Sequence, residues 1–383
     1  MRLHIIFCFI FMLIGHSCST KSEMYKYTLA PDRAIVIPLG TESLNFSNCL
    51  QFFENEGTNY LSVLNERTNT IEIYNIDHPS KINSIKIHIE GANAFGEVMT
   101  FHMIDLDTFF LNSLALREIA IANGTGDIIK RYSYRKDNNG RSFKPTIPFR
   151  GERPLLIGKI VYIGQQYGAM QNAGILNSDL REESPLAMSL NMETGECHSY
   201  PLLYPEELIG KDIAGMDVIR EVGYKGVYVY HFGSIPKFFL TSDLEKFSVV
   251  PMPDNLNIKL NDSFYPSIHD IQVYMTNLLQ HDQVLNIHFD VYRECYYMIV
   301  REHTEVIDKN MDLFLKTKYP KCCIYIFDRG LKLVGKTYFH DDSYSFQMTF
   351  IGPEGLYISE DHPNNPDFDE DFMRFRLFKL EKL

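Results

Sequence analysis

The sequence predicts an all-β fold built as a single β-propeller, and three observations carry this prediction. Apolar and polar residues alternate over short runs such as 70–74 and 84–89, which is the two-residue period of a half-buried strand. Apolar spacing of the helical kind is hard to find, and its best stretch, residues 267–280, fits a strand nearly as well. The chain has 27 phenylalanines and 23 tyrosines, and both residue types favour strands.

A unit of two or three strands joined by a polar turn recurs along the chain. These turns contain Gly, Asn or Asp, the residues that most readily adopt the positive φ angle that tight hairpin turns require. The predicted strands group as 60–65 with 71–76, 109–121 with 128–134, 186–191 with 197–200, 227–232 with 238–240 and 247–250, 324–327 with 333–338, and 355–358 with 373–380. Six units give a period of roughly 50–60 residues, within propeller range. We therefore expect six blades, with five or seven as alternatives.

The ends of the chain offer a way to close such a ring. A strand from the chain start that completes the last blade leaves no open sheet edge there. Residues 34–38 read Ala-Ile-Val-Ile-Pro and are the candidate, with Pro38 tolerated at the end of a strand. No linker or low-complexity stretch divides the chain, so we expect one propeller domain over residues 31–383.

The first residues have the pattern of an export signal. One basic residue precedes the ten uninterrupted apolar residues 5–14, which are too few to cross a ~30 Å hydrocarbon core at ~1.5 Å each but suit a signal peptide. Small residues then precede Cys18, although Gly15 stands where lipoprotein signals usually have Leu. We expect residues 1–17 to be a signal peptide, Cys18 to be lipidated and residues 18–30 to be a tether. Plain secretion and an uncleaved anchor are the alternatives.

Composition narrows the classes of partner. The net charge is −12 and the basic residues are scattered, so no stripe is available to neutralise phosphates and nucleic acid is not an expected partner. Without Cys8 and Cys18, five cysteines remain at irregular spacing, which is not a disulfide framework. Cys322 and Cys323 are neighbours in a strand-like run, so they point to opposite faces and make no metal pair. The five cysteines are expected to be small buried residues.

Two further segments carry a family resemblance. After the lipidation pattern come Asp-Arg-Ala-Ile-Val-Ile-Pro-Leu at 32–39 and Phe-Asp-Val-Tyr-Arg-Glu-Cys-Tyr-Tyr at 289–297. Over nearly the whole mature sequence the chain resembles the Bacteroidetes lipoproteins grouped as domain of unknown function 4221. The resemblance implies a six-bladed propeller held in the cell envelope by a lipid, in the outer membrane, and it supplies no catalytic residues. Surface export in such proteins uses a short acidic run after the cysteine. Residues 19–23 hold a single acid, so the periplasmic and surface faces both remain open.

One loop has the composition of a binding site. Residues 164–174 follow a predicted strand over 156–163 and lack a cluster of charges. Amide side chains both donate and accept hydrogen bonds, and a tyrosine adds a flat amphipathic face. The residues expected to contact a ligand are Gln165, Gln166, Tyr167 and Asn172. The expected ligand is a neutral glycan or peptide, and a turn loosened by glycine is the alternative.

A long acidic loop near the end of the chain is the candidate metal site. Asp367, Asp369 and Asp371 have the alternating spacing of the first ligands in a calcium loop. An EF-hand would need Gly at the sixth position and Glu at the twelfth, where Phe372 and Phe378 stand, so that motif is excluded. A simpler calcium site and a solvated loop are the two interpretations, and no other cofactor is expected.

These features favour a non-catalytic ligand-binding or scaffolding lipoprotein of the bacterial cell envelope. The alternative is a propeller hydrolase or lyase that acts on glycans, since propeller enzymes assemble their sites from loops on one face. No nucleophile-elbow, zincin or phosphate-loop motif occurs. An enzyme would need two carboxylates, or a histidine with a carboxylate, that converge in one place.

Overall fold

The computed structural model describes residues 25–113, 116–140, 155–165, 175–211, 218–233, 235–261, 276, 279–304, 321–340 and 343–383. The strands are β1 (Tyr27–Pro38), β2 (Leu50–Asn55), β3 (Thr58–Asn65), β4 (Thr70–Asn75), β5 (Ser80–Lys86), β6 (Thr100–Met103), β7 (Thr108–Ser113), β8 (Glu118–Asn123), β9 (Ile128–Ser133), β10 (Leu155–Ile157), β11 (Ile160–Gly164), β12 (Ala187–Asn191), β13 (Cys197–Ser199), β14 (Val218–Val222), β15 (Tyr228–Phe232), β16 (Lys237–Thr241), β17 (Ser248–Pro251), β18 (Gln283–Asp290), β19 (Cys295–Arg301), β20 (Cys322–Asp328), β21 (Leu333–Phe339), β22 (Ser345–Gly352), β23 (Gly355–Ser359) and β24 (Phe372–Lys382). Short helical segments are α1 (Ser178–Glu183), η1 (Glu206–Leu208), η2 (Tyr224–Gly226) and η3 (Asp254–Leu256).

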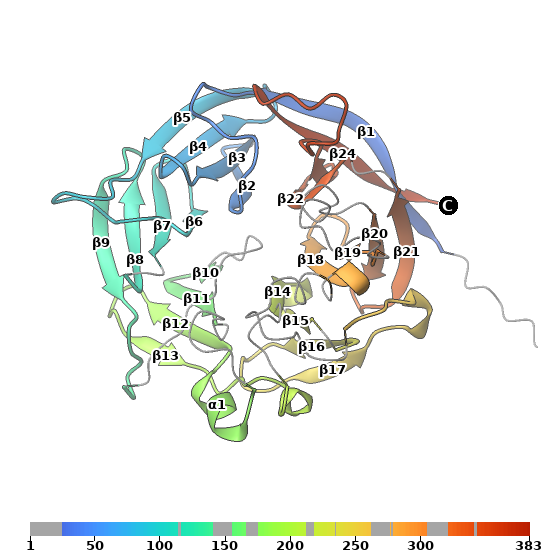
Figure 1. Cartoon of the computed structure of the whole chain (residues 1–383). Helices are drawn as coiled ribbons and strands as arrows, with labels where there is room; N and C mark the ends of the chain where they lie inside the picture. Colours follow the sequence, from blue (N-terminus) through green and yellow to red (C-terminus); the bar gives the residue numbers. More distant parts are fainter. Residues whose placement is uncertain are drawn as a thin grey trace, which may run out of the picture.

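The strands form antiparallel sheets that stand around a common centre (Figure 1). Within the described residues, four sheets have four strands each, in the orders β2–β5, β6–β9, β10–β13 and β14–β17. The first strand of each sheet lies nearest the centre and the fourth lies at the rim (Figure 1). Consecutive strands are antiparallel, so their connections alternate between the two faces of the ring. The prediction of an all-β, propeller-like fold is confirmed.

A further sheet has eight strands and consists of two four-stranded halves. One half is β18–β21, and the other, which we call the closing half, has the order β22, β23, β24, β1. The halves meet where β1 runs parallel to β21, with Tyr27 opposite Gly335. A Cβ atom on Gly335 would lie 2.2 Å from the carbonyl oxygen of Tyr27, so only glycine allows the two strands to come this close.

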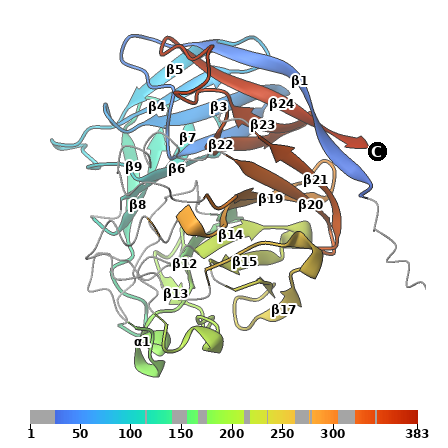
Figure 2. The same ribbon diagram turned by 45° about the vertical axis from the view of Figure 1, so that its right-hand side comes forward.

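Strand β1 joins the start of the chain to its end. It pairs antiparallel with β24, from Tyr27 opposite Lys382 to Pro38 opposite Phe372, with one irregularity after Pro31. Figure 2 shows β1 beginning beside β21 and then following β24. The closure predicted for residues 34–38 is therefore confirmed, although the strand begins before residue 31, where we expected the tether to end.

Apolar cores separate each sheet from the next. One buried cluster lies between each neighbouring pair of sheets or halves, and the last of them packs the closing half against β2–β5. In that cluster Ile35 and Ile37 of β1 pack with Leu61 and Val63 of β3 and with Phe375 of β24. The arrangement is thus a closed ring in which every described sheet buries both faces.

A buried carboxylate fixes the segment between β1 and β2. Glu72 of β4 accepts hydrogen bonds from Ser43 Oγ (2.8 Å), Lys81 Nζ (2.8 Å) and Tyr74 Oη (2.6 Å). Burial alone would raise the pKa of Glu72, but these three hydrogen bonds outweigh it and hold the pKa below its usual value. The carboxylate therefore ties the segment that leaves the closing half to the sheet that follows it.

Two strands predicted from alternation are wrong in detail. Residues 109–121 are not one strand but parts of β7 and β8, and Arg117 in the turn before β8 has φ +52°. Residues 156–163 are likewise a hairpin of β10 and β11 that turns at Gly158, where φ is +60°. Neither break carries a cluster of turn residues.

The five cysteines of the described chain are buried, as predicted, and the prediction that Cys322 and Cys323 point to opposite faces is confirmed because they belong to different cores. Within the described residues, no helix is long and apolar enough to cross a bilayer.

Candidate functional site

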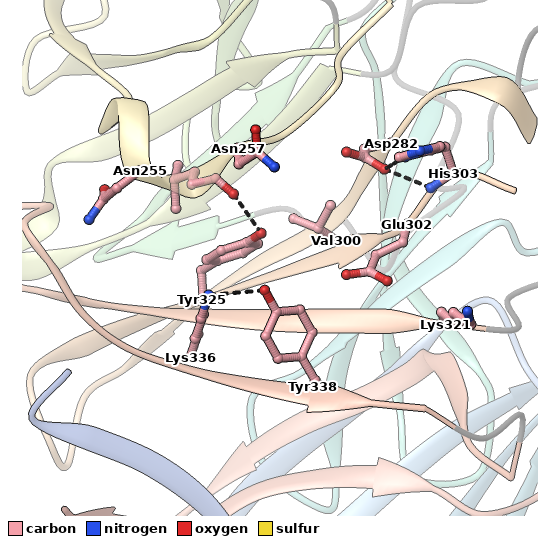
Figure 3. Close-up of a pocket in the computed structure, with 11 residues that line it drawn as sticks. Asn255, Asn257, Asp282, Val300, Glu302, His303, Lys321, Tyr325, Lys336 and Tyr338 are labelled. Carbon is pink, nitrogen blue, oxygen red and sulfur yellow. Dashed lines mark hydrogen bonds and ion pairs between the residues drawn. The ribbon is translucent and has the colours of Figure 1, made fainter. Parts of the chain in front are cut away.

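A pocket of about 410 Å³ lies between the β14–β17 sheet and the β18–β21 half. The segment after β17 forms one wall through Asn255, Leu256 and Asn257, and the other walls come from the start of β18 and from β19, β20 and β21 (Figure 3). It adjoins the apolar core of these two sheets, because Leu256, Val300 and Tyr325 belong to both. A volume of this size suits a small molecule.

The strand register explains which side chains line the pocket. Tyr325 of β20 stands opposite Lys336 of β21, and Tyr338 stands opposite Cys323. Lys336 and Tyr338 are two residues apart, so both side chains point to the same face of the sheet. The Tyr325 hydroxyl donates to the carbonyl oxygen of Leu256 at 3.0 Å, which fixes η3 against β20. Burial raises the pKa of this hydroxyl, so it remains protonated and continues to donate.

Asp282 organises the opposite side of the pocket. Its Oδ2 accepts from the Lys259 backbone N–H at 2.6 Å, and its Oδ1 accepts from the His303 backbone N–H at 2.6 Å. The same Oδ1 lies 2.8 Å from Nδ1 of the His303 ring. Asp282 is 8% exposed, so its carboxylate is buried, and its hydrogen bonds go to the two backbone N–H groups and the His303 ring. It holds the ring of His303 in place (Figure 3).

Lys336 is held between two aromatic rings. Its Nζ lies 4.8 Å from the ring centre of Tyr338 and 4.9 Å from that of Tyr25, distances at which an ammonium is attracted to a ring face. The same Nζ donates to Tyr338 Oη at 3.0 Å. Burial favours the neutral amine, but the hydrogen bonds to the tyrosines outweigh it and raise the pKa of Lys336. The side chain therefore stays positively charged at neutral pH.

Two further charged groups, Glu302 and Lys321, line the pocket. The carboxylate of Glu302 and the ammonium of Lys321 have no hydrogen bond or ion pair within the described part of the chain, although the backbone N–H of Glu302 donates to the Lys321 carbonyl. With Asp282 already engaged, the charges that a ligand could meet are Glu302, Lys321 and Lys336. These groups could hold a polar molecule that carries both an acidic and a basic group, and His303 could accept a proton from it.

Most of the predicted binding loop lies outside the described residues, as do Gln166, Tyr167, Asn172 and the lipidation candidate Cys18. Gln165 is described: it is 4% exposed at the end of β11, and its backbone N–H donates to the carbonyl of Leu186 at 2.9 Å. It belongs to the sheet β10–β13, which does not line the pocket. The structure thus leaves the binding prediction for this loop open.

The acidic loop has the geometry of hydrogen-bonded turns. Asp367, Asp369 and Asp371 are exposed, and the Asp369 carboxylate accepts from the Asp371 backbone N–H at 3.0 Å. Across the described ranges, no three His, Cys, Asp or Glu side chains are placed to hold a metal ion, so the geometry gives the calcium prediction no support. The loop is instead fixed by Asp361, whose carboxylate accepts from Arg374 Nε at 3.0 Å and from the Arg374 backbone N–H at 2.6 Å.

Sequence reasoning missed the pocket because its residues come from distant segments. A signal was present, since Glu302 and His303 directly follow a strand of β-branched and aromatic residues. Lys336 and Tyr338 also alternate with less polar neighbours on a predicted strand. Neither pattern predicts that β20 pairs with β21 or where η3 lies, and these two features bring the groups together.

Comparisons with known proteins agree with this architecture. Residues 27–338 match the family model for the domain of unknown function DUF4221. The chain is similar to a crystal structure of a DUF4221 family member from Bacteroides vulgatus, with a TM-score of 0.81, 20% identity, and coverage of 94% of this chain and 99% of the other. A protein of Bacteroides fragilis that is described as exported has a TM-score of 0.53 and 10% identity, over 93% of this chain and 95% of its own.

Similarity to enzymes is weaker. Virginiamycin B lyase from Staphylococcus aureus matches with a TM-score of 0.43 and 10% identity, over 92% of this chain and 99% of the lyase, which supports no argument about activity. No curated protein matches the chain. Because the family model covers most of the chain, the protein belongs to the DUF4221 family, whose function is unknown.

Proposed function

We propose that this protein is a lipid-anchored binding protein of the bacterial cell envelope, in which a six-bladed propeller holds a small polar ligand in the pocket between the β14–β17 sheet and the β18–β21 half. Cys18 carries the lipid after residues 1–17 are removed, and the anchor lies in the outer membrane. The six blades are the four four-stranded sheets and the two halves of the eight-stranded sheet. Six cores between neighbouring units support this count.

The pocket is the observation that carries the binding proposal. Its walls are fixed by hydrogen bonds before any ligand arrives, through Tyr325 on one side and Asp282 on the other. A preformed site spares a ligand the entropy cost of ordering its walls. Two acidic and two basic side chains line it together with tyrosines and asparagines, which suits a ligand without net charge, such as a glycan or a peptide. A calcium ion is not required for this proposal.

A thermal-shift panel tests the proposal. Neutral oligosaccharides and short peptides are added to the wild type and to Tyr338→Ala, which removes an aromatic ring from the pocket. Tyr292→Ala is the matched control, because Tyr292 is similarly exposed (47% against 42%) but lies in the turn between β18 and β19, at the opposite end of the sheet. A compound that stabilises the wild type and the control but not Tyr338→Ala supports the site. Stabilisation that is equal in all three proteins, or none from any compound, refutes it.

One observation favours a second function, a hydrolase or lyase acting on glycans. The His303 ring is held by Asp282 at 2.8 Å, and within the described residues its Nε2 has no partner. A histidine oriented by a buried carboxylate is an arrangement that serves as a general base. Turnover of a bound glycan by the wild type, lost in His303→Gln while binding persists, would establish this activity. Binding without turnover favours the binding protein.

A further inference from the structure

The chain enters the fold beside the pocket. The backbone N–H of Lys26 donates to the carbonyl of Val334 at 2.8 Å, and Tyr27 pairs with Gly335. The ring of Tyr25 lies against the ammonium of Lys336, at 4.9 Å, and that ammonium lines the pocket. The residues that precede the domain therefore join it at the rim, next to a wall of the pocket.

The number of residues before this point limits how far the pocket can stand from a membrane. Six residues lie between Cys18 and Tyr25, and the seven Cα-to-Cα steps of a fully extended chain between them span about 25 Å. If Cys18 carries the lipid, as proposed above, the rim that holds Lys336 stays within about that distance of the bilayer surface. The pocket then lies closer to lipid headgroups than most of the ring.

The charges available in the pocket define what it can recognise. Lys336 and Lys321 are ammonium groups that attract an anion, and Tyr338 adds a hydroxyl next to the first of them. Glu302 is a carboxylate without a partner among the described residues, so it can accept hydrogen bonds from a primary ammonium. Asp282 does not compete, because both of its oxygens are bonded. The available groups are thus two ammoniums and one carboxylate, which complement a ligand that carries a phosphate beside a primary ammonium.

We propose that this pocket binds the phosphoethanolamine headgroup of a membrane lipid. The phosphate is held by Lys336, Lys321 and the Tyr338 hydroxyl, since charge-assisted hydrogen bonds to phosphate are stronger than neutral ones. The primary ammonium is held by Glu302. This inference rests on the proposed anchor and on the proposed pocket, and it names the ligand of that pocket.

The first test separates the two charges of the ligand. Calorimetry measures the binding of glycerophosphoethanolamine and of glycerol 3-phosphate, which lacks the ammonium, to the chain from Ser19 to Leu383, which keeps every described residue. We expect Lys336→Met to weaken both by about tenfold or more, and Glu302→Gln to weaken only the first. Lys332→Met, an exposed lysine just before β21, is the control and should bind like the wild type. Unchanged melting temperatures show that the variants fold.

The second test asks whether the ligand is part of a membrane. The same chain, without its lipid, is sedimented with phosphatidylcholine vesicles that contain or lack phosphatidylethanolamine. We expect several-fold more protein on vesicles with phosphatidylethanolamine, and loss of that difference in Glu302→Gln. Equal binding to both vesicles, or binding of the free headgroup only, overturns the membrane source. A glycan or peptide that binds the pocket while no phosphate compound does would overturn this inference and leave the proposed binding function standing.

Discussion

Closure of the ring by β1 can be tested with one buried side chain. Ile37 is fully buried between β24 and the first sheet, and Val36 beside it is 43% exposed on the opposite face of the strand. Truncating a buried isoleucine to alanine costs about 2–5 kcal/mol, through lost transfer energy and the cavity left behind. We expect Ile37→Ala to lower the free energy of unfolding by about 3 kcal/mol, and Val36→Ala to change it by less than about 0.5 kcal/mol.

The expected shift in melting temperature is small because the domain is large. An unfolding entropy of about 2.1 cal/mol/K per residue over roughly 360 residues is about 0.75 kcal/mol/K, so 3 kcal/mol corresponds to about 4 °C. Urea unfolding gives the free energy and calorimetry gives the temperature, and a single coincident transition in both is needed for the comparison. Equal destabilisation by the two substitutions would refute the reasoning that Ile37 is the buried member of the closing strand.

Three other substitutions test the supports of the ring and the acidic loop. Glu72→Gln should cost about 2 kcal/mol at neutral pH, because the Lys81 ammonium loses its carboxylate. Since the folded-state pKa of Glu72 is lowered, this difference in urea unfolding should shrink as the pH falls below about 4.5, and a constant difference contradicts it. The contribution of Asp361 to stability depends on pH in the opposite direction. Burial raises its pKa from 3.8 to about 6, so its contribution is full below pH 3.8 and is lost as the pH rises through 6. Asp361→Asn should remove that decline, and a carboxyl that titrates near 4 by NMR would disprove the assignment. Gly335→Ala should cost about 2–3 kcal/mol from the collision with Tyr27, whereas Gly330→Ala in the same hairpin should cost much less, and equal effects would exclude the collision.

The fold was largely predictable because strand alternation and turn residues are local signals. Strands β12, β13, β20 and β21 lie where the strand patterns placed them. The closing strand was found because a ring of blades closes when a strand from the chain start completes the last one, and residues 34–38 form an apolar run there. The prediction failed at two turns that lack a cluster of turn residues, one at Arg117 and one at the single glycine Gly158. The turn before β8 is made by Arg117 in a left-handed conformation, which glycine or asparagine would have signalled and arginine does not.

The candidate site was not predictable in the same way. Composition led to a loop rich in amides, whereas the pocket combines Asp282, Glu302 and Lys336 from three strands or strand ends with η3. Their proximity depends on pairing between strands and on the packing of one sheet on the next. A single sequence does not specify which of its many strand-end charges face one another. The lipid anchor at Cys18 stays a prediction from a local pattern.

Hydrogen exchange followed by mass spectrometry tests the binding pocket most directly. The chain is labelled with and without the compound from the glycan, peptide and headgroup panel that stabilises it most. Our proposal predicts slower exchange in peptides that cover residues 255–257, 300–303 and 333–339, since each of these segments holds residues that line the pocket, and unchanged exchange in β2 and β6 near the centre of the ring. Protection confined to the central strands, with none in the three pocket segments, would contradict it.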